Sequence, residues 1–190
     1  FKEQAVDVVL LEVGIGGLLD TTNVVTGEIA VITSVGLDHQ ETLGGTIAEI
    51  AQQKAGIFKK GKKAVVGPLS DDAVAVCQEK AEQLAVGLHA FQKDFGIEQD
   101  RFWNESVELV LPSLSLKGDY QRENAAVALE AFFLYMEGLD EEVDMEQVKH
   151  ALQETRWPGR LELFGDQVYL DGAHNPHAML RLIEFANSLA

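Results

Sequence analysis

Two apolar runs early in the chain each end in residues that can bind a metal ion or transfer a proton. Glu12 closes the run that begins at Val6, and Asp38 and His39 follow the run that begins at Ile29. The carboxyl ends of parallel strands meet at one edge of a sheet, and ligands bind there. We therefore expect Glu12 and His39 to converge on one crevice and to bind a metal ion such as magnesium. A polar strand end and an ordinary turn are the alternatives.

Lys54 stands on the apolar face of a predicted helix. Ile47, Ile50, Ala51 and Lys54 occupy positions i, i+3, i+4 and i+7, which lie on one face of a helix. Lysine in such a position usually extends its ammonium group to solvent. If Lys54 is instead buried in the same crevice, the neutral amine is favoured and its pKa falls. A neutral amine can add carbon dioxide, and the resulting carbamate would be an anionic metal ligand.

A second group of polar residues follows another predicted strand. Asp171 ends that strand, His174 comes three residues later, and Asn175 and Pro176 are suited to the start of a helix. The free N–H groups of a helix start, together with His174, could bind an anion. A turn in which these groups only cap the helix is the alternative. Asn124 is a further candidate, because it opens an otherwise apolar helix and can cap it or reach a ligand.

Two glycine-rich segments resemble nucleotide-binding loops, and neither fits. The segment at residues 14–17 lacks the third glycine of a dinucleotide fingerprint, since Leu19 occupies that position. The segment at residues 56–63 lacks the final Ser or Thr of a Walker A loop and follows a helix instead of a strand. We interpret the second segment as a helix end at which glycine stops the helix and lysines complement its dipole.

Composition limits the class of protein. The 190 residues suffice for one large domain or parts of two, and 46% are hydrophobic. Fifteen basic and 31 acidic residues give a net charge of −16, which disfavours nucleic acid and anionic membranes as partners. Cys77 is the one cysteine, so we expect no internal disulfide and a reducing compartment. The sequence has no membrane-spanning run and no signal-peptide pattern.

The order of elements predicts an α/β fold with a largely parallel sheet. Apolar β-type runs alternate with helical patterns through the first half of the chain. The expected strands cover residues 6–13, 29–35, 63–67 and 88–91, and the expected helices begin at Thr46 and Ser70. Thr46 and Glu49 form a capping box.

The pattern changes at Asp94. Short antiparallel strands are expected at residues 95–97, 101–103 and 107–116, the last being a hairpin that turns at residues 112–113. A long, almost entirely apolar helix (119–136) should be buried, and Asp144 should cap the next helix. Residues 156–160 are the expected domain boundary. A strand pair (161–164 and 167–171) and a helix from Pro176 should follow it.

Six stretches of this sequence, taken together, identify a family. They are LEVGIGGLLDTTN (11–23), ITSVGLDH (32–39), IAQQKAGI (50–57), RENAAVAL (122–129), WPGRLE (157–162) and DGAHNP (171–176). In content and order they resemble folylpolyglutamate synthase / dihydrofolate synthase, of the Mur ligase superfamily. The resemblance implies that residues 1–155 are the later part of a P-loop-type mononucleotide-binding ATPase domain. Residues 156–190 would begin a Rossmann-like ligase domain.

The resemblance also implies an activity. Such enzymes use ATP to convert a folate carboxylate into an acyl phosphate, which the amino group of L-glutamate attacks to form an amide. The substrates would be ATP, folate and L-glutamate, with Mg²⁺ as cofactor, in a monomeric cytoplasmic enzyme. The matching residues are Glu12 and His39 as magnesium ligands, Lys54 as the carbamate, Asn124, Arg160 and Asp171 at ATP, and His174 near the reacting groups.

The sequence departs from the family in ways that limit these expectations. The family's P-loop, of GTNGKGS type, is absent, and Leu18 stands where relatives commonly have Arg. The chain starts at Phe1 and ends in a helical pattern, so we expect a piece of a longer protein, without ligase activity by itself. Whether the whole enzyme makes dihydrofolate, polyglutamates or both stays open.

Other functions remain as alternatives. A related ligase could act on a peptidoglycan precursor or a cyanophycin-type acid, although the WPGRLE and DGAHNP stretches favour folate. A metal-dependent hydrolase could use Glu12, His39 and Lys54, but the sequence offers no further ligand after a strand. An α/β module without activity is the remaining alternative.

Overall fold

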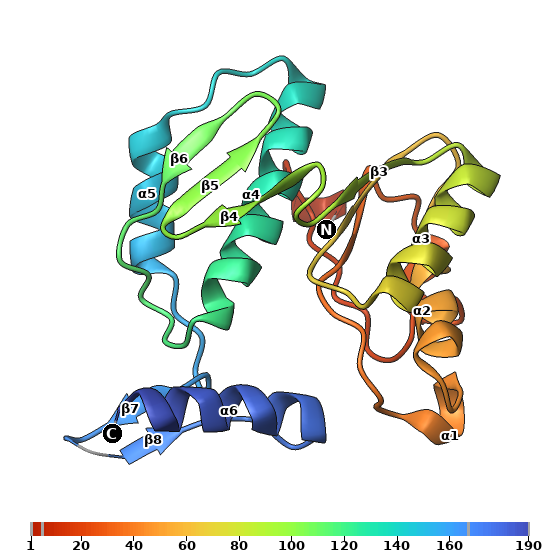
Figure 1. The fold of residues 1–190 in the computed structure, drawn as a ribbon. Coiled ribbons are helices and arrows are strands. Elements are labelled where there is room, and N and C mark those ends of the chain that lie inside the picture. The colour runs from red at the N-terminus through yellow and green to blue at the C-terminus, as the bar shows by residue number, and fades with distance from the viewer. Residues whose placement is uncertain (1, 5, 167, 190) are drawn as a thin grey trace.

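The first unit of the fold is a three-stranded parallel sheet (Figure 1). The computed structural model describes residues 2–4, 6–166 and 168–189. The strands are β1 (Ile29–Ile32), β2 (Lys63–Val66) and β3 (Gly87–Ala90), in that order across the sheet. Lys63 lies in register with Ile29 on one side and Gly87 on the other. The predicted α/β class and parallel sheet are therefore confirmed.

Two helices cover one face of this sheet, α2 (Ile47–Ala55) and α3 (Asp71–Leu84). The alternation of side chains along β2 decides which residues meet them. Ala64 and Val66 pack into a core with Cys77 of α3, whereas Val65 joins the core on the opposite face. The predicted capping box at the start of α2 is present, with Glu49 N–H donating to Thr46 Oγ1 at 3.2 Å.

Helix α4 (Tyr120–Leu139) lies between two sheets. It packs against β1 and β2 on one side and against a small antiparallel sheet on the other. That sheet consists of β4 (Phe95–Glu98), β5 (Arg101–Asn104) and β6 (Glu108–Val110). Because α4 is covered on both sides, it needs apolar residues almost all round, as the sequence predicted. Helix α5 (Met145–Glu154) follows, capped by Asp144 as expected.

A smaller unit follows the exposed segment 155–158. It consists of an antiparallel pair, β7 (Glu162–Phe164) and β8 (Val168–Leu170), and helix α6 (Pro176–Ser188). Asn175 caps α6 and Pro176 is its first residue, which confirms the prediction for this turn. Gln167, predicted as the first residue of the second strand, lies outside the described residues.

The strand predicted at residues 6–13 is wrong. In the described part of the chain this run forms no strand hydrogen bonds, and its side chains are largely exposed, with Leu10 at 93%. An apolar run becomes a strand only where a neighbouring strand pairs with its backbone. Only short 3₁₀ turns lie near it, at Lys2–Gln4 and Thr21–Val24. The next predicted strand forms, but it ends at Ile32 instead of Val35.

The hairpin predicted at residues 112–113 is also wrong. After β6, Leu111 is buried and donates its N–H to the carbonyl of Asp100, and Leu114 packs on the α4 core. The apolar alternation therefore reflects packing of an irregular segment, not a strand. Between the strand expected at residues 29–35 and the helix expected from Thr46 lies a short helix, α1 (Gln40–Leu43), which was not predicted.

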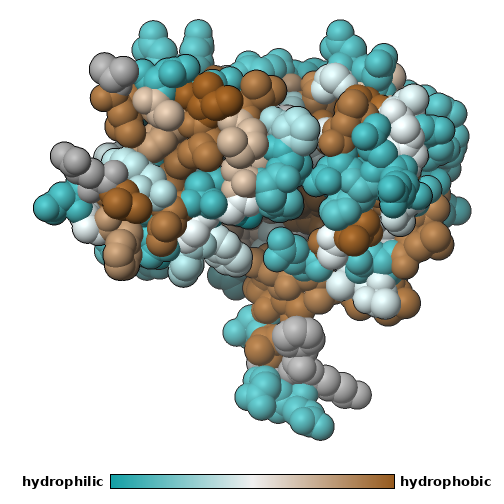
Figure 2. Space-filling view, turned by 90° about the horizontal axis from the view of Figure 1, so that it is seen from below, coloured by the Kyte–Doolittle hydropathy of each residue, from teal (hydrophilic) through white to brown (hydrophobic). Residues whose placement is uncertain are grey.

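Apolar side chains are exposed on the last unit. Figure 2 views the molecule from below and shows brown side chains among teal ones over this face. Exposed members include Leu163, Phe164, Val168, Leu170, Leu180 and Ile183. Across the described ranges, no helix combines the length and the apolar character that a membrane span requires.

Candidate functional site

A cavity of about 470 Å³ lies where the carboxyl ends of β1 and β2 meet α4 and α6. The amino-terminal end of α4 points toward α6, which places the first turns of both helices in the cavity wall (Figure 1). This volume is typical of small-molecule sites. Polar lining residues are Glu12, Thr33, Ser34, Tyr120, Gln121, Glu123, Asn124, Thr155, Arg160, Asp171, Asn175 and Arg181.

The structure brings four of the predicted site residues together here. Glu12, Asn124, Arg160 and Asp171 all line the cavity, although they are spread over 160 positions of sequence. The other three predicted residues are not part of its lining: His39, Lys54 and His174. Glu12 thus lines the cavity, whereas His39 and Lys54 lie around Asp38, which contacts the cavity residue Asn175.

The first turns of α4 supply amide groups to the cavity. Asn124 Nδ2 donates to Gln121 Oε1 at 2.9 Å, and Gln121 is buried. This contact orients Asn124 along the wall, so the ligand-facing alternative fits better than the capping one. Tyr120 lies beside them, and burial, followed by the charge of Asp171, raises the pKa of its hydroxyl.

Asp171 holds its own loop together. Its two carboxylate oxygens accept from the N–H groups of Leu161 at 2.9 Å and Ala173 at 2.8 Å. Leu161 is buried and has a left-handed backbone with φ of 46°, which is unfavourable for a branched residue. Asp171 thus stabilises this conformation, a role that the sequence analysis did not predict. A carboxylate has about four acceptor positions, so Asp171 can still accept from a ligand.

The Arg160 guanidinium lies against a neighbouring glycine. A side chain at Gly172 would place its Cβ 3.0 Å from the Arg160 guanidinium. Gly172 N–H also donates to the carbonyl of Gly159 at 2.9 Å, which joins the two loops that present Arg160 and Asp171. Glycine at position 172 therefore leaves room for the guanidinium at the cavity.

Asp38 organises the residues beside the cavity. Its Oδ1 accepts from His39 N–H and its Oδ2 from Asn175 Nδ2, both at 2.8 Å. His39 Nε2 lies 3.9 Å from the same Oδ2. Lys54 is partly buried, and burial lowers the pKa of its amine, opposed by the charge of Asp38. The predicted direction of the Lys54 pKa is confirmed, whereas the carbamate stays a prediction.

The glycine pair at residues 16–17 serves a close approach to α2. A Cβ on Gly17 would lie 2.9 Å from the carbonyl oxygen of Gln53, and Leu18 N–H donates to that oxygen at 2.8 Å. Asn23 Nδ2 then donates to the carbonyls of Leu18 and Gly56. These glycines fit a loop against the end of a helix. The rejection of a dinucleotide fingerprint agrees with this packing.

The donor atoms near the cavity suit a hard cation. The cavity is lined by Glu12, whose side chain carries a carboxylate, and by Thr33 and Ser34, whose side chains carry hydroxyl groups. Magnesium prefers such oxygen ligands and retains several waters. Within the described residues, no group of three His, Cys, Asp or Glu side chains is close enough to form a metal site by itself. Glu12 and His39 would therefore need oxygens from water or phosphate.

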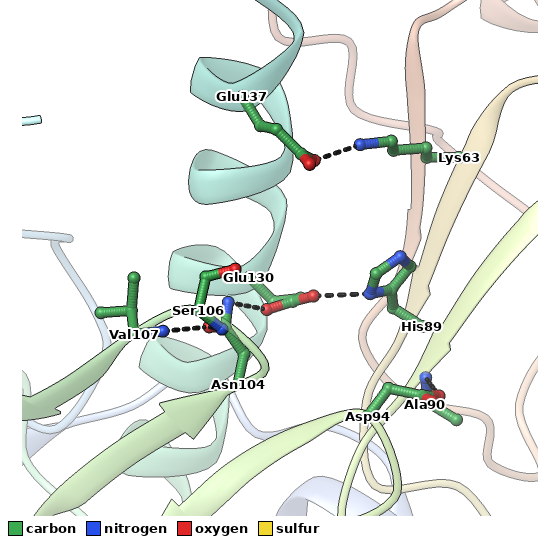
Figure 3. A network of polar contacts seen from close by, with 9 residues as sticks. All are labelled: Lys63, His89, Ala90, Asp94, Asn104, Ser106, Val107, Glu130 and Glu137. Atoms are coloured by element: carbon green, nitrogen blue, oxygen red, sulfur yellow. Dashed lines mark hydrogen bonds and ion pairs between the residues drawn. The ribbon is translucent and has the colours of Figure 1, made fainter. Parts of the chain in front are cut away.

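A larger cavity, about 520 Å³, lies on the other side of α4. Its central polar group is Glu130, which accepts from Asn104 Nδ2 at 2.8 Å and lies 2.7 Å from His89 Nδ1 (Figure 3). Glu130 is only 1% exposed, and its partners satisfy both carboxylate oxygens. This network ties α4 to β3 and β5, so we assign it a structural role.

Comparison with known proteins shows the family to which this chain belongs. The sequence model described as the Mur ligase middle domain matches residues 1–132. The chain belongs to the Mur ligase family. Among curated Mur ligase relatives, the folylpolyglutamate synthase of Lacticaseibacillus casei is 38% identical over 194 residues, covering 96% of this chain and 45% of the relative. The dihydrofolate synthase/folylpolyglutamate synthase of Bacillus subtilis is 40% identical over 200 residues, covering 96% and 46%.

Solved Mur ligase structures share this fold. The complex named FPGS-AMPPCP-folate superposes with a TM-score of 0.96 at 35% identity, covering all of this chain and 49% of that one. A bifunctional folylpolyglutamate synthase/dihydrofolate synthase with Mn, AMPPNP and L-glutamate bound gives 0.83 at 34% identity, covering 98% and 45%. The chain spans about half the length of the curated relatives it matches.

Proposed function

We propose that the whole protein is an ATP-dependent ligase that joins L-glutamate to folate through an acyl phosphate. The meeting of Asn124, Arg160 and Asp171 at one cavity is the main support. This cavity lies in a fold that matches a folylpolyglutamate synthase complex with an ATP analogue and folate. The activity is consistent with the names of both curated relatives.

The cavity residues suggest how a nucleotide would be oriented. We propose that the Arg160 guanidinium binds the phosphates, because its planar donors match phosphate oxygens. Asp171 would accept from a ribose hydroxyl, since a carboxylate beside phosphate is repelled. Asn124, positioned by Gln121, would donate or accept at the remaining polar edge of the nucleotide.

Glu12 and His39 are the proposed protein ligands of magnesium. When bound, the ion would neutralise phosphate charge during transfer. Lys54 is the proposed carbamate, because its partial burial favours the neutral amine that reacts with carbon dioxide. In ¹³C-bicarbonate, Lys54 should give a carbamate NMR signal that Lys54→Arg lacks. The same spectrum from both chains would overturn the assignment.

His174 is the proposed residue at the reacting groups. Its Nδ1 lies 2.7 Å from the carbonyl oxygen of Gly172. With the proton on Nδ1, this contact would leave Nε2 as an acceptor. Such an acceptor could take a proton from the ammonium group of glutamate, which must become a free amine before it attacks.

The activity can be tested in the whole protein that contains this chain. We expect Mg²⁺- and ATP-dependent incorporation of radiolabelled L-glutamate into tetrahydrofolate or dihydropteroate, with ADP formed in equal amount. Arg160→Met should abolish most of it. Residues 1–190 alone should form no product. Turnover with a peptidoglycan precursor but not with any folate would favour the related-ligase alternative and contradict the proposal.

The oligomeric state, the cellular location and the partners of the whole protein belong to the same proposal. We expect a monomer that acts in the cytoplasm, since the single cysteine fits a reducing compartment. Its partners would be the small substrates ATP, folate and L-glutamate. Size-exclusion chromatography with light scattering would test the monomer, and a dimer mass would contradict it.

A further inference from the structure

The Asp38 carboxylate contacts its neighbour His39 and also Asn175, which lies 137 positions away in the sequence. One oxygen accepts from the backbone N–H of His39 at 2.8 Å. That residue has a left-handed backbone, with φ of 50° and ψ of 36°, just before α1. A side chain that accepts from the following N–H helps to hold such a conformation. Asp38 therefore helps to fix the direction in which His39 leaves the loop after β1.

The other oxygen of Asp38 reaches the start of α6. It accepts from Asn175 Nδ2 at 2.8 Å, while Asn175 Oδ1 accepts from Ala178 N–H at 2.8 Å as the cap of the helix. One side chain thus performs two tasks with its two ends. The side-chain oxygen of Asn175 caps α6, and its side-chain amide donates to Asp38 in the loop that precedes α1.

We propose that Asn175 and Asp38 form a positioning pair that couples the placement of α6 to the conformation of His39. If α6 moves away, Asp38 loses one partner and is free to rotate away from His39 N–H. When α6 is seated, both oxygens of Asp38 are engaged and His39 is held. If His39 binds magnesium as proposed above, the position of α6 would also affect that ligand, and this part rests on the proposed function. The coupling between α6 and His39 itself requires no ligand.

A second contact between α6 and the first half of the chain provides a control. Arg181, in the second turn of α6, lies 3.3 Å from Glu123 of α4. This ion pair also holds α6 in place, but within the described residues neither partner forms a hydrogen bond with Asp38 or His39. Breaking it should loosen α6 without acting through Asp38.

Three variants, made in the whole protein that contains this chain, separate these contacts. Asn175→Asp keeps an oxygen that caps Ala178 but places a carboxylate against Asp38. The double variant Asp38→Asn with Asn175→Asp reverses donor and acceptor. In it, the amide of residue 38 can donate to residue 175 while its oxygen still accepts from His39 N–H. Arg181→Met removes the second contact, together with the ion pair between Arg181 and Glu184 inside α6, and leaves Asp38 and Asn175 in place.

Amide hydrogen exchange by NMR gives the readout, expressed as protection factors for His39 and Ala178. Asn175→Asp should lower the His39 protection factor roughly three- to tenfold, the effect of losing one hydrogen bond, and leave Ala178 protected. The double variant should restore His39, and Arg181→Met should leave it unchanged. The proposal is overturned if Asn175→Asp leaves His39 unchanged, if the double variant fails to restore it, or if Arg181→Met lowers it equally.

Discussion

Helix α4 holds polar side chains at two places, and they are held differently. Glu130 is 1% exposed, and Asn104 and His89 contact its two oxygens at 2.8 and 2.7 Å. Asn124, six residues earlier, is exposed at a cavity wall and oriented by Gln121. A buried polar group whose partners all come from the protein contributes to folding. A polar group oriented by the protein but open to a cavity can still bind a ligand.

The two cavities are similar in size. The cavity beside Glu130 is about 520 Å³ and the one beside Asn124 about 470 Å³. The smaller one receives side chains from the ends of parallel strands, where ligands bind in α/β folds. Position in the fold and open polar groups therefore locate the candidate site better than volume.

The largest expected effect is on folding and comes from Glu130→Ala. Removing one member of a buried polar network should lower the free energy of unfolding by about 3 kcal/mol, because Asn104 and His89 lose their partner. The matched change Asn124→Ala on the same helix should cost no more than about 0.5 kcal/mol. Urea unfolding of both variants measures the difference. Equal losses would remove the distinction between the two places.

The next effect is on nucleotide binding and comes from Arg160→Met. Loss of charge-assisted hydrogen bonds to phosphate should weaken binding of an ATP analogue roughly 10- to 100-fold. Glu130→Gln, which preserves the size of the buried side chain, should bind normally once folded. Isothermal titration of both variants measures the affinity for the ATP analogue. Here the variant at the Asn124 cavity should show the large effect and the variant at Glu130 none. An unchanged affinity in Arg160→Met would separate Arg160 from the site.

Asp171→Asn should have a smaller, local effect. The introduced amide group would face the N–H of Leu161 or Ala173, donor against donor, at a cost of about 1–2 kcal/mol. Hydrogen exchange at these two amides should accelerate, while exchange in α4 stays as it was. If both amides keep their protection, Asp171 does not hold this loop and its role is confined to ligands.

The smallest expected effect concerns Cys77, a buried group away from both places. Burial raises the pKa of this thiol to about 11, from a usual value near 9. The thiolate forms more readily in the unfolded chain, so the contribution to stability is complete below pH 9 and is lost as pH rises toward 11. In Cys77→Ala, the free energy of unfolding should decrease less steeply between pH 9 and pH 11, as measured by urea unfolding at several pH values. Identical pH profiles would contradict the assignment.

Local rules predicted much of the fold. The capping box of α2, the buried α4, and the Asn175–Pro176 start of α6 each follow from a few neighbouring residues. The strand expected at residues 6–13 did not form, because strand formation depends on a pairing partner that local sequence does not reveal. The hairpin expected at residues 112–113 failed because apolar alternation can also come from an irregular segment packed on a core.

The lining of the candidate cavity was predictable in part, whereas its internal contacts were not. Spacing and resemblance led to Glu12, Asn124, Arg160 and Asp171, which do line one cavity. The contact between Asp38 and Asn175 spans 137 positions of the sequence. The pairing of Glu130 with His89 joins helix α4 to strand β3. Such contacts depend on how distant elements pack, so periodicity and spacing give no signal for them.

The central claim is that the cavity beside Asn124 binds nucleotide and the one beside Glu130 does not. Titration of the ¹⁵N-labelled whole protein that contains this chain with AMPPCP and Mg²⁺ tests it most directly. We expect amide shifts at Thr33, Ser34 and Asn124, with Asn104 and Val107 of the Glu130 network unchanged. Shifts confined to that network, or none at either place at millimolar ligand, would contradict the account.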